Sequence, residues 1–152
     1  ELDGTLNVEN SLKGIEFAVN RNIYGSEIDV QRTKDGYYII NHDENLKRLS
    51  EINKDVQEIT LEEIKGLKIK DKYGESNIAT LEEVLDYSKG KIKLFIELKG
   101  VSADKKMADD LVSMIKEREM LNDCVFISFK YDLIDYIENQ FPEVGTGYLY
   151  GQ

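Results

Sequence analysis

The feature that most constrains the fold of this chain is a repeated succession of short apolar segments and longer segments with helical spacing. Residues 92–98 and 125–129 are rich in branched and aromatic side chains, and Met107, Leu111 and Ile115 repeat at helical spacing between them. Apolar runs this short, bounded by helices, are typical of buried parallel strands. The order predicts an α/β domain built from βα units around a parallel sheet.

The first half of the chain carries local signals of the same kind. Apolar residues recur at helical spacing over residues 12–22, where Asn10 or Ser11 can cap the first free N–H groups. The next segment alternates acidic and branched apolar residues, which is the period of a strand. Side chains two residues apart lie on one face of a strand, so Glu27 and Asp29 are expected to point together.

Two later segments begin with the same capping signal. Thr60 is followed three residues on by Glu63, and Thr80 is followed in the same way by Glu83. In such a capping box each side chain accepts a hydrogen bond from the backbone N–H of the other residue. We therefore expect a short helix to begin at each of these sites.

Composition limits the classes of partner. The 152 residues carry 20 Lys and Arg against 30 Asp and Glu, a formal net charge of −10, and 41% of them are hydrophobic. This length and apolar share predict one globular domain with a sizeable core. No stretch approaches the ~20 apolar residues that cross a bilayer, and the acidic balance argues against a nucleic-acid-binding surface. An anionic ligand would need a local positive charge, such as a metal ion.

The only histidine of the chain, His42, follows a hairpin signal. Asp35 and Gly36 stand between two apolar segments, and Asp-Gly is a strong signal for a two-residue turn. If Asp35 and Gly36 form that turn, the residue numbers of each pair across the hairpin add to 71. Asp29 is then expected opposite His42. This register predicts Cβ atoms within roughly 5.5 Å, close enough to share a ligand or a proton.

Three carboxylates, those of Glu27, Asp29 and Glu97, are expected toward the carboxyl ends of strands. Ligands of α/β sheets and barrels bind at this edge. Charged groups that converge there repel one another unless a cation holds them, and oxygen ligands suit Mg²⁺ or Ca²⁺. The spacing alone leaves open that each carboxylate is a solvated residue and that His42 is a surface residue, with Asp43 as a turn residue that orients it.

Several motifs together resemble those of the glycerophosphodiester phosphodiesterase family. In chain order they are Val8-Glu9-Asn10-Ser11, Gly25-Ser26-Glu27-Ile28-Asp29-Val30, Thr33-Lys34-Asp35-Gly36, His42-Asp43, Thr80-Leu81-Glu82-Glu83-Val84-Leu85, Ile96-Glu97-Leu98-Lys99 and Ser128-Phe129. The acidic strand, the Thr-Lys-Asp-Gly turn and His-Asp in close succession are the most specific part. The resemblance implies a TIM barrel and hydrolysis of glycerophosphodiesters, as the small-molecule substrate, to glycerol 3-phosphate and an alcohol.

The resemblance also implies roles for individual side chains. Glu27, Asp29 and Glu97 match the ligands of a divalent metal, Mg²⁺ or Ca²⁺, and His42 matches one of two acid/base histidines. A metal that bridges phosphate oxygens neutralises the charge that develops during displacement at phosphorus. An imidazole can give a proton to the departing alkoxide or take one from the attacking hydroxyl.

Three further residues are expected to contact the substrate. Lys99 matches a family lysine near the phosphate, and an ammonium group is a point charge suited to a phosphate oxygen. Ser128 and Phe129 are expected to line the substrate mouth. Without the resemblance, Lys99 reads as a surface ion pair and Phe129 as a core residue.

The chain departs from the family pattern in two respects. Nothing like the family's His-Arg-Gly motif, which supplies the other histidine, precedes Val8, and by our count the chain stops at the sixth barrel strand. We therefore expect residues 1–152 to be part of a catalytic domain, present as an incomplete barrel. Open strand edges favour self-association. The segment alone is expected to hydrolyse glycerophosphodiesters poorly or not at all.

Other functions stay open at this point. A catalytically silent module on the same scaffold could bind a phospholipid headgroup or a partner protein. A related phosphodiesterase acting on sphingomyelin-type lipids would share the metal site, but those proteins tend to carry an internal disulfide, which the single Cys124 cannot form. Residues 48–67 are similar to membrane-attached bacterial members, which leaves open membrane attachment through regions outside this segment.

Overall fold

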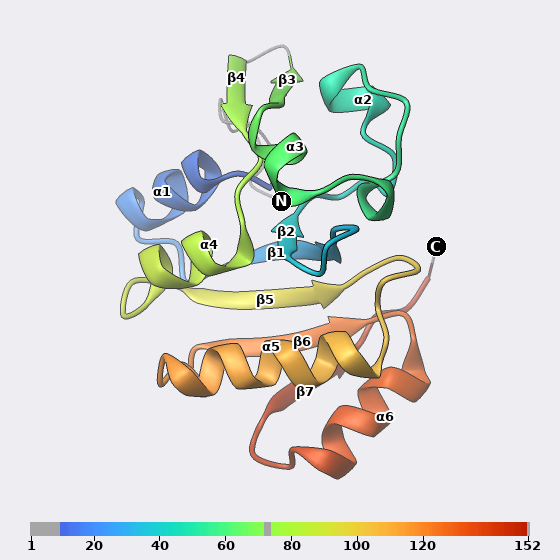
Figure 1. The fold of residues 1–152 in the computed structure, drawn as a ribbon. Helices are drawn as coiled ribbons and strands as arrows, with labels where there is room; N and C mark the ends of the chain where they lie inside the picture. Colours follow the sequence, from blue (N-terminus) through green and yellow to red (C-terminus); the bar gives the residue numbers. More distant parts are fainter. Residues whose placement is uncertain (1–9, 72–73, 152) are drawn as a thin grey trace.

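The computed structural model describes residues 10–71 and 74–151, which form a sheet flanked by helices (Figure 1). The strands are β1 (Gly25–Arg32), β2 (Tyr38–Ile40), β3 (Lys68–Asp71), β4 (Gly74–Asn77), β5 (Lys93–Leu98), β6 (Cys124–Ser128) and β7 (Gly145–Tyr148). The helices are α1 (Leu12–Asn20), α2 (Lys47–Ser50), the 3₁₀ helix η1 (Val56–Glu58), α3 (Leu61–Lys65), α4 (Leu81–Ser88), α5 (Lys105–Glu117) and α6 (Tyr131–Gln140). The elements expected from the periodic segments are present, and only their ends differ.

Within the described residues, the main sheet has five strands in the order β2-β1-β5-β6-β7. β1 pairs with β5, β5 with β6 and β6 with β7 in parallel, whereas β2 pairs with β1 in the antiparallel sense. Because the strands of a TIM barrel are all parallel, β2 is a hairpin extension rather than a barrel strand. Without β2, the last described strand, β7, takes the fifth place in the barrel and not the sixth that the sequence predicts.

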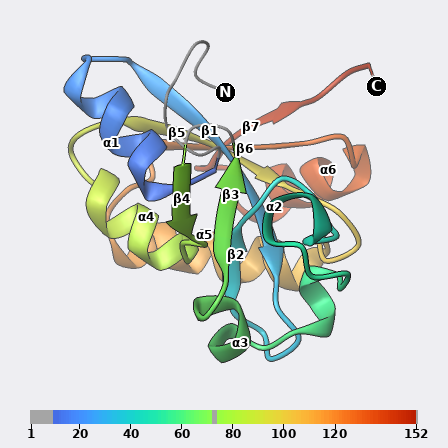
Figure 2. The same cartoon turned by 90° about the horizontal axis from the view of Figure 1, so that it is seen from above.

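One face of the sheet and helices α1, α4, α5 and α6 enclose the main core (Figure 2). Ile28, Ile96 and Phe126 come from three neighbouring strands and are almost fully buried in this layer. Met107 and Leu111 of α5 are buried against the same layer, as their helical spacing predicts. The parallel sheet and its connecting helices thus form a continuous α/β layer.

The opposite face of the sheet is less covered. Phe95 lies two residues from Glu97 on β5, and Val125 and Ile127 are their register partners on β6, so the four side chains share this face. Phe95, Val125 and Ile127 remain partly exposed. In a closed barrel this face would be the filled interior. The chain therefore has the expected α/β architecture of a (β/α)₈-type barrel that is present in part.

The helices begin where the local signals predict. The Ser11 side chain accepts a hydrogen bond from the backbone N–H of Gly14 at 3.1 Å and caps α1. Both Thr-to-Glu capping boxes form, at the starts of α3 and α4. These caps satisfy N–H groups that the first helical turn leaves free.

The hairpin of β1 and β2 differs from the expected register by one residue. Val30 pairs with Ile40, so the numbers of paired residues add to 70 rather than 71. Asn41, not His42, therefore stands opposite Asp29, and the Asn41 N–H donates to the Asp29 carbonyl oxygen at 3.0 Å. The predicted opposition of Asp29 and His42 was wrong.

The cause of this shift is the length of the hairpin loop. The Thr33 N–H donates to the Tyr37 carbonyl oxygen at 2.8 Å, which leaves three residues in the loop instead of two. Gly36 ends the loop with a φ of 89°, a conformation that glycine adopts without a steric penalty. A three-residue loop that ends in a left-handed glycine is a common hairpin geometry, and Asp-Gly is compatible with it as well.

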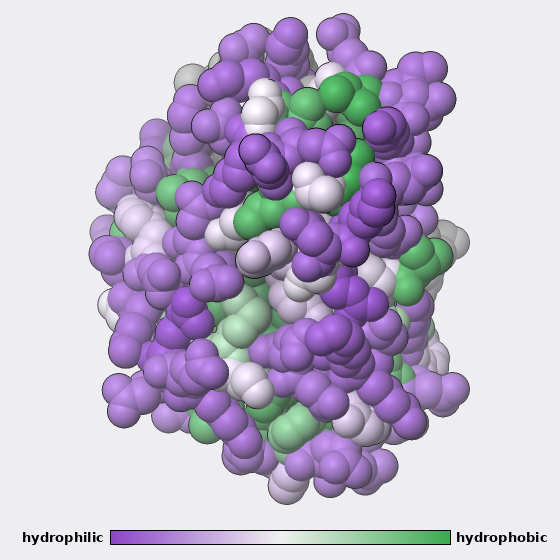
Figure 3. Space-filling view, viewed as in Figure 1, coloured by the Kyte–Doolittle hydropathy of each residue, from purple (hydrophilic) through white to green (hydrophobic). Residues whose placement is uncertain are grey.

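Residues 41–80 form an excursion between β2 and α4 that contains α2, η1, α3 and the antiparallel pair β3 and β4 (Figure 1). It packs around a second, smaller core of Ile39, Leu46, Val56, Ile59, Ile64, Ile69 and Ile78. The molecular face in Figure 3 is mainly hydrophilic, with apolar residues in small patches. Within residues 10–71 and 74–151, no helix has the length and apolar character needed to span a membrane.

Candidate active site

Three carboxylates lie together on two neighbouring parallel strands, with Asp29 and Glu97 near the carboxyl ends of the paired stretch and Glu27 in the first half of β1, earlier than expected. Glu27 and Asp29 come from β1 and Glu97 from β5, and Asp29 and Glu97 are direct partners in the strand register. One ligand oxygen from each side chain lies within 4.8 Å of the other two. Asp29 and Glu97 are each 6% exposed, whereas Glu27 is exposed. The structure thus brings together the three carboxylates that the sequence places at strand ends.

Burial, together with the neighbouring carboxylate of Asp29, changes the ionisation of Glu97. Burial raises the pKa of the Glu97 carboxyl to about 7, and a hydrogen bond and repulsion from Asp29 add to the shift. Lys99 opposes the shift, since its Nζ lies 3.9 Å from Glu97 Oε2. A proton on Glu97 relieves the repulsion within the cluster, and a bound cation would do the same.

Asn10 joins the carboxylate cluster from the residues just before α1. Its Nδ2 donates to Asp29 Oδ2 at 2.9 Å, and its Oδ1 accepts from the Asp29 backbone N–H at 2.9 Å. The sequence identifies Asn10 only as a candidate helix cap, a role that Ser11 takes. The one signal for a further role is its place in a family motif, of which Val8 and Glu9 lie outside the described residues.

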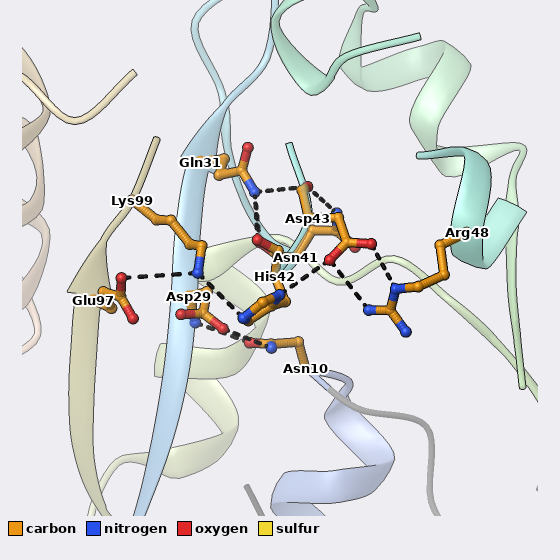
Figure 4. Close-up of polar contacts among 9 residues, drawn as sticks. All are labelled: Asn10, Asp29, Gln31, Asn41, His42, Asp43, Arg48, Glu97 and Lys99. Atoms are coloured by element: carbon orange, nitrogen blue, oxygen red, sulfur yellow. Dashed lines mark hydrogen bonds and ion pairs between the residues drawn. The ribbon is translucent and has the colours of Figure 1, made fainter. Parts of the chain in front are cut away.

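His42 lies between Asp43 and Lys99 at the edge of the cluster (Figure 4). Asp43 Oδ1 is 3.0 Å from His42 Nδ1, and Lys99 Nζ is 3.2 Å from His42 Nε2. A carboxylate only accepts and an ammonium group only donates, so these contacts require a proton on Nδ1 and a lone pair on Nε2. Asp43 therefore orients His42, as expected, and the ring can accept a proton at Nε2.

Arg48 holds Asp43 in this position. Its Nε donates to Asp43 Oδ2 at 2.6 Å, and its Nη2 donates to Asp43 Oδ1 at 3.2 Å. The Arg48 guanidinium holds the pKa of the Asp43 carboxyl below its usual range, and the hydrogen bond with His42 acts in the same direction. The carboxylate therefore stays charged and keeps the His42 tautomer. Sequence spacing carries no signal for this role of Arg48.

A buried glutamine supports the backbone of the histidine segment. Gln31 Nε2 donates to the carbonyl oxygens of Asn41 at 2.7 Å and of Asp43 at 2.8 Å. Gln31 is fully buried on β1, next to the site where pairing with β2 ends. Its side chain therefore replaces strand pairing as the link between β1 and this segment, a contact that the sequence pattern does not reveal.

Glu44 ties the histidine segment to the loop after β5. Its Oε1 accepts from the Val101 N–H at 2.9 Å. Gly100 in this loop has a φ of 74°, and a Cβ there would lie 2.3 Å from Glu44 Oε1, so another residue would strain the backbone and displace the Glu44 carboxylate. Lys130 Nζ donates to the Gly100 carbonyl oxygen at 2.7 Å from the other side. These contacts hold the loop that follows Lys99 beside the histidine segment.

An open cleft of about 800 Å³ lies beside this arrangement. Its lining residues are His42, Asp43, Glu44, Asn45, Lys47, Arg48 and Lys99. Three of them, Lys47, Arg48 and Lys99, are cationic and two, Asp43 and Glu44, are acidic, so the lining has a small excess of positive charge in a chain with a net charge of −10. This local excess favours an anionic ligand at the site.

Ser128 and Phe129, which the resemblance places at the substrate mouth, lie at the end of β6 and do not line this cleft. Ser128 is 1% exposed, and its Oγ donates to the Leu98 carbonyl oxygen at 3.1 Å and accepts from the Lys130 N–H at 3.0 Å. The hydroxyl thus joins the ends of β5 and β6. Phe129 is 37% exposed at the same edge of the sheet.

The residues present fit a divalent cation. Three carboxylates supply the hard oxygen ligands that Mg²⁺ and Ca²⁺ prefer, and a cation would offset both the burial of the Glu97 charge and its repulsion from Asp29. Lys99 and His42 stand next to this cluster with a charge for a phosphate oxygen and a proton-accepting nitrogen. The arrangement can therefore stabilise charge at phosphorus and transfer a proton.

Comparison with known proteins relates the chain to glycerophosphodiester phosphodiesterases. The chain is 32% identical over 148 residues to a glycerophosphodiester phosphodiesterase of Caldanaerobacter subterraneus, over 93% of this chain and 61% of that protein. A glycerophosphodiester phosphodiesterase structure from Parabacteroides distasonis has a TM-score of 0.82 and 27% identity, over 99% of this chain and 62% of that chain.

A phosphodiesterase from Oleispira antarctica, solved in complex with the product sn-glycerol-3-phosphate, has a TM-score of 0.79 and 26% identity, over 92% of this chain and 60% of that chain. The chain spans about three fifths of the length of these relatives. The sequence profile described as the Glycerophosphoryl diester phosphodiesterase family matches residues 3–151. The chain therefore belongs to the glycerophosphoryl diester phosphodiesterase family.

Proposed function

We propose that this chain supplies the metal-binding and proton-transfer residues of an enzyme that hydrolyses glycerophosphodiesters to glycerol 3-phosphate and an alcohol. One observation carries the proposal: the carboxylate cluster is joined to His42 through Lys99, which contacts both Glu97 and the imidazole. Membership of the family supports the reaction class, and the product complex of the Oleispira relative supports the product.

Glu27, Asp29 and Glu97 would hold the cation, Mg²⁺ or Ca²⁺. When bound, the ion supplies positive charge to the phosphate oxygens as negative charge develops on them. Lys99 would bind another phosphate oxygen, since its ammonium group stands between the cluster and the imidazole. In doing so Lys99 leaves His42 Nε2, and this nitrogen becomes free to accept a proton from the substrate.

His42 would carry the proton transfer. Its Nε2 takes the proton of the attacking hydroxyl or, as the imidazolium, gives a proton to the departing alkoxide. Asp43, kept charged by Arg48, stabilises the positive ring that forms. Phe129 would contact the substrate at the rim, and Ser128 would support the mouth from below by joining two strand ends.

The direct test is release of glycerol 3-phosphate from glycerophosphocholine and glycerophosphoethanolamine by the full-length protein. We expect release in buffer with Mg²⁺ or Ca²⁺, loss of release with excess chelator, and recovery when the ion is restored. Absence of release with both substrates and both ions would contradict the proposed activity.

A substitution at Glu27 separates metal binding from folding. Glu27→Gln should abolish calorimetric binding of the divalent ion and leave the thermal midpoint nearly unchanged, because an exposed carboxylate repelled by its neighbours contributes little stability. Glu16→Gln, at an exposed glutamate of α1, is the matched control and should bind like the wild type. Equal affinity before and after Glu27→Gln would remove Glu27 from the metal role.

A further inference from the structure

Asn10 holds Asp29 through both ends of its side-chain amide, by the bonds to Asp29 Oδ2 and to the Asp29 backbone N–H. Figure 4 shows Asp29 between Asn10 and Glu97, with one carboxylate oxygen toward Asn10. We propose that Asn10 is a positioning residue that fixes the Asp29 carboxylate for metal binding. This inference rests on the metal role proposed above and names the residue that orients the ligand.

The strand pairing explains why Asp29 needs this partner. The Asp29 carbonyl oxygen accepts from the Asn41 N–H, and in an antiparallel ladder the Asp29 N–H would donate back to the Asn41 carbonyl oxygen. That carbonyl oxygen instead accepts from Gln31 Nε2 at 2.7 Å, because pairing of β1 with β2 ends here. The Asn10 amide takes the place of the missing ladder bond at the residue that carries the carboxylate.

The same contact reduces the repulsion within the cluster. Asp29 is 6% exposed and its carboxylate lies within 4.8 Å of those of Glu27 and Glu97, so little water is available to solvate its charge. Asn10 Nδ2 supplies a hydrogen bond to the charged group, and the second bond at Oδ1 restricts rotation of the amide. Partners of this kind typically raise metal affinity about 10–100-fold.

The backbone conformation at Asn10 allows the side-chain hydrogen bonds to be removed without a change in backbone strain. Asn10 has a φ of 45°, in the left-handed region that asparagine tolerates and glycine adopts freely. Asn10→Gly therefore removes both hydrogen bonds without adding backbone strain. Ser11→Ala is the matched control, because it removes the cap of α1 one residue away and keeps the Asn10 side chain.

The test is calorimetric titration of Mg²⁺ and Ca²⁺ into the full-length protein, with hydrogen exchange at the Asp29 amide measured without metal. We expect Asn10→Gly to weaken binding about 10–100-fold and to speed exchange at the Asp29 amide. Ser11→Ala should lower the thermal midpoint and bind the ion with nearly wild-type affinity.

Three results would overturn the assignment, and each points to a different error. Unchanged affinity in Asn10→Gly means that Asn10 does not position the ligand, even if the metal site is real. An equal loss in Ser11→Ala means that general loosening of the segment causes the effect. Absence of divalent binding by the wild type overturns the proposed metal role, and the role of Asn10 falls with it.

Discussion

The two halves of the candidate site are built by different means. The carboxylate half stands on neighbouring parallel strands, whose register makes Asp29 the direct partner of Glu97. The histidine half stands at the start of the excursion, and the His42 side chain is 54% exposed. The ring is held by side-chain contacts with Asp43 and Lys99, and not by strand pairing.

This difference has a physical consequence. Backbone hydrogen bonds between the strands place the carboxylates, and these bonds do not depend on the charge of the side chains. The position of His42 depends on exposed charged contacts, which salt screens and which contribute little stability one by one. Metal binding and proton transfer should therefore be separable by mutation, and the following predictions test this separation from the largest expected effect to the smallest.

Removal of the imidazole should have the largest effect. His42→Ala is expected to lower hydrolysis of glycerophosphodiesters by about 10²–10⁴-fold, which is the usual contribution of general acid–base catalysis. Divalent affinity measured by calorimetry should stay at the wild-type value, and free imidazole should restore part of the rate. A parallel loss of metal affinity would show that the two halves are not independent.

A change at Asp43 should have a smaller effect in the same half. Asp43→Asn is expected to lower the rate about 10–100-fold, because hydrogen bonds to charged groups contribute about 1.5–3 kcal/mol and the new amide can favour the wrong tautomer. Asp104→Asn is the control, because Asp104 forms a similar ion pair that lies away from the site. Its Oδ2 is 2.7 Å from Arg32 Nη2. If both variants lose rate equally, the effect is not specific to His42.

The link between the halves can be broken at Gln31. Gln31→Met keeps the volume but removes the donor to the Asn41 carbonyl oxygen, so the free energy of unfolding should fall by about 1–3 kcal/mol. Urea denaturation measures this change. At temperatures where the variant is folded, the rate should fall and the divalent affinity should not. Loss of affinity alone would place Gln31 with the carboxylate half.

The smallest effect should be a pH-dependent gain in stability from Glu97→Gln in the presence of chelator. The folded pKa of Glu97 is about 7 against an ordinary value of 4.5, so between these values the folded state holds a proton that the unfolded state has lost. Wild-type stability from this group is therefore complete below pH 4.5 and is lost as pH rises through 7.

The measurement is the thermal midpoint of both proteins from pH 4 to pH 9. Glutamine resembles the neutral acid, so the variant should exceed the wild type by a few degrees at high pH, with the difference shrinking as pH falls toward 4.5. A difference that is constant with pH, or that grows toward low pH, contradicts the crowded-carboxylate description of the cluster.

Much of the fold follows from local patterns. Ser11, Thr60 and Thr80 cap helices at the positions where their spacing predicts caps. The shared face of Glu27 and Asp29 follows from strand periodicity. The hairpin register was wrong by one residue because Asp-Gly suits both a two-residue turn and the three-residue loop that forms, and no local rule separates them.

By itself the sequence determined the helices and strands of the βα units and the capped starts of α3 and α4, because these depend on neighbours within a few positions along the chain. It did not reveal α2, η1, β3 or β4 in the excursion. Only the tertiary structure decided which side chains meet. The contact of Asn10 with Asp29 spans 19 residues and that of His42 with Lys99 spans 57, and both depend on strand register and loop length. A change of one residue in a loop moves such contacts while every local signal stays the same.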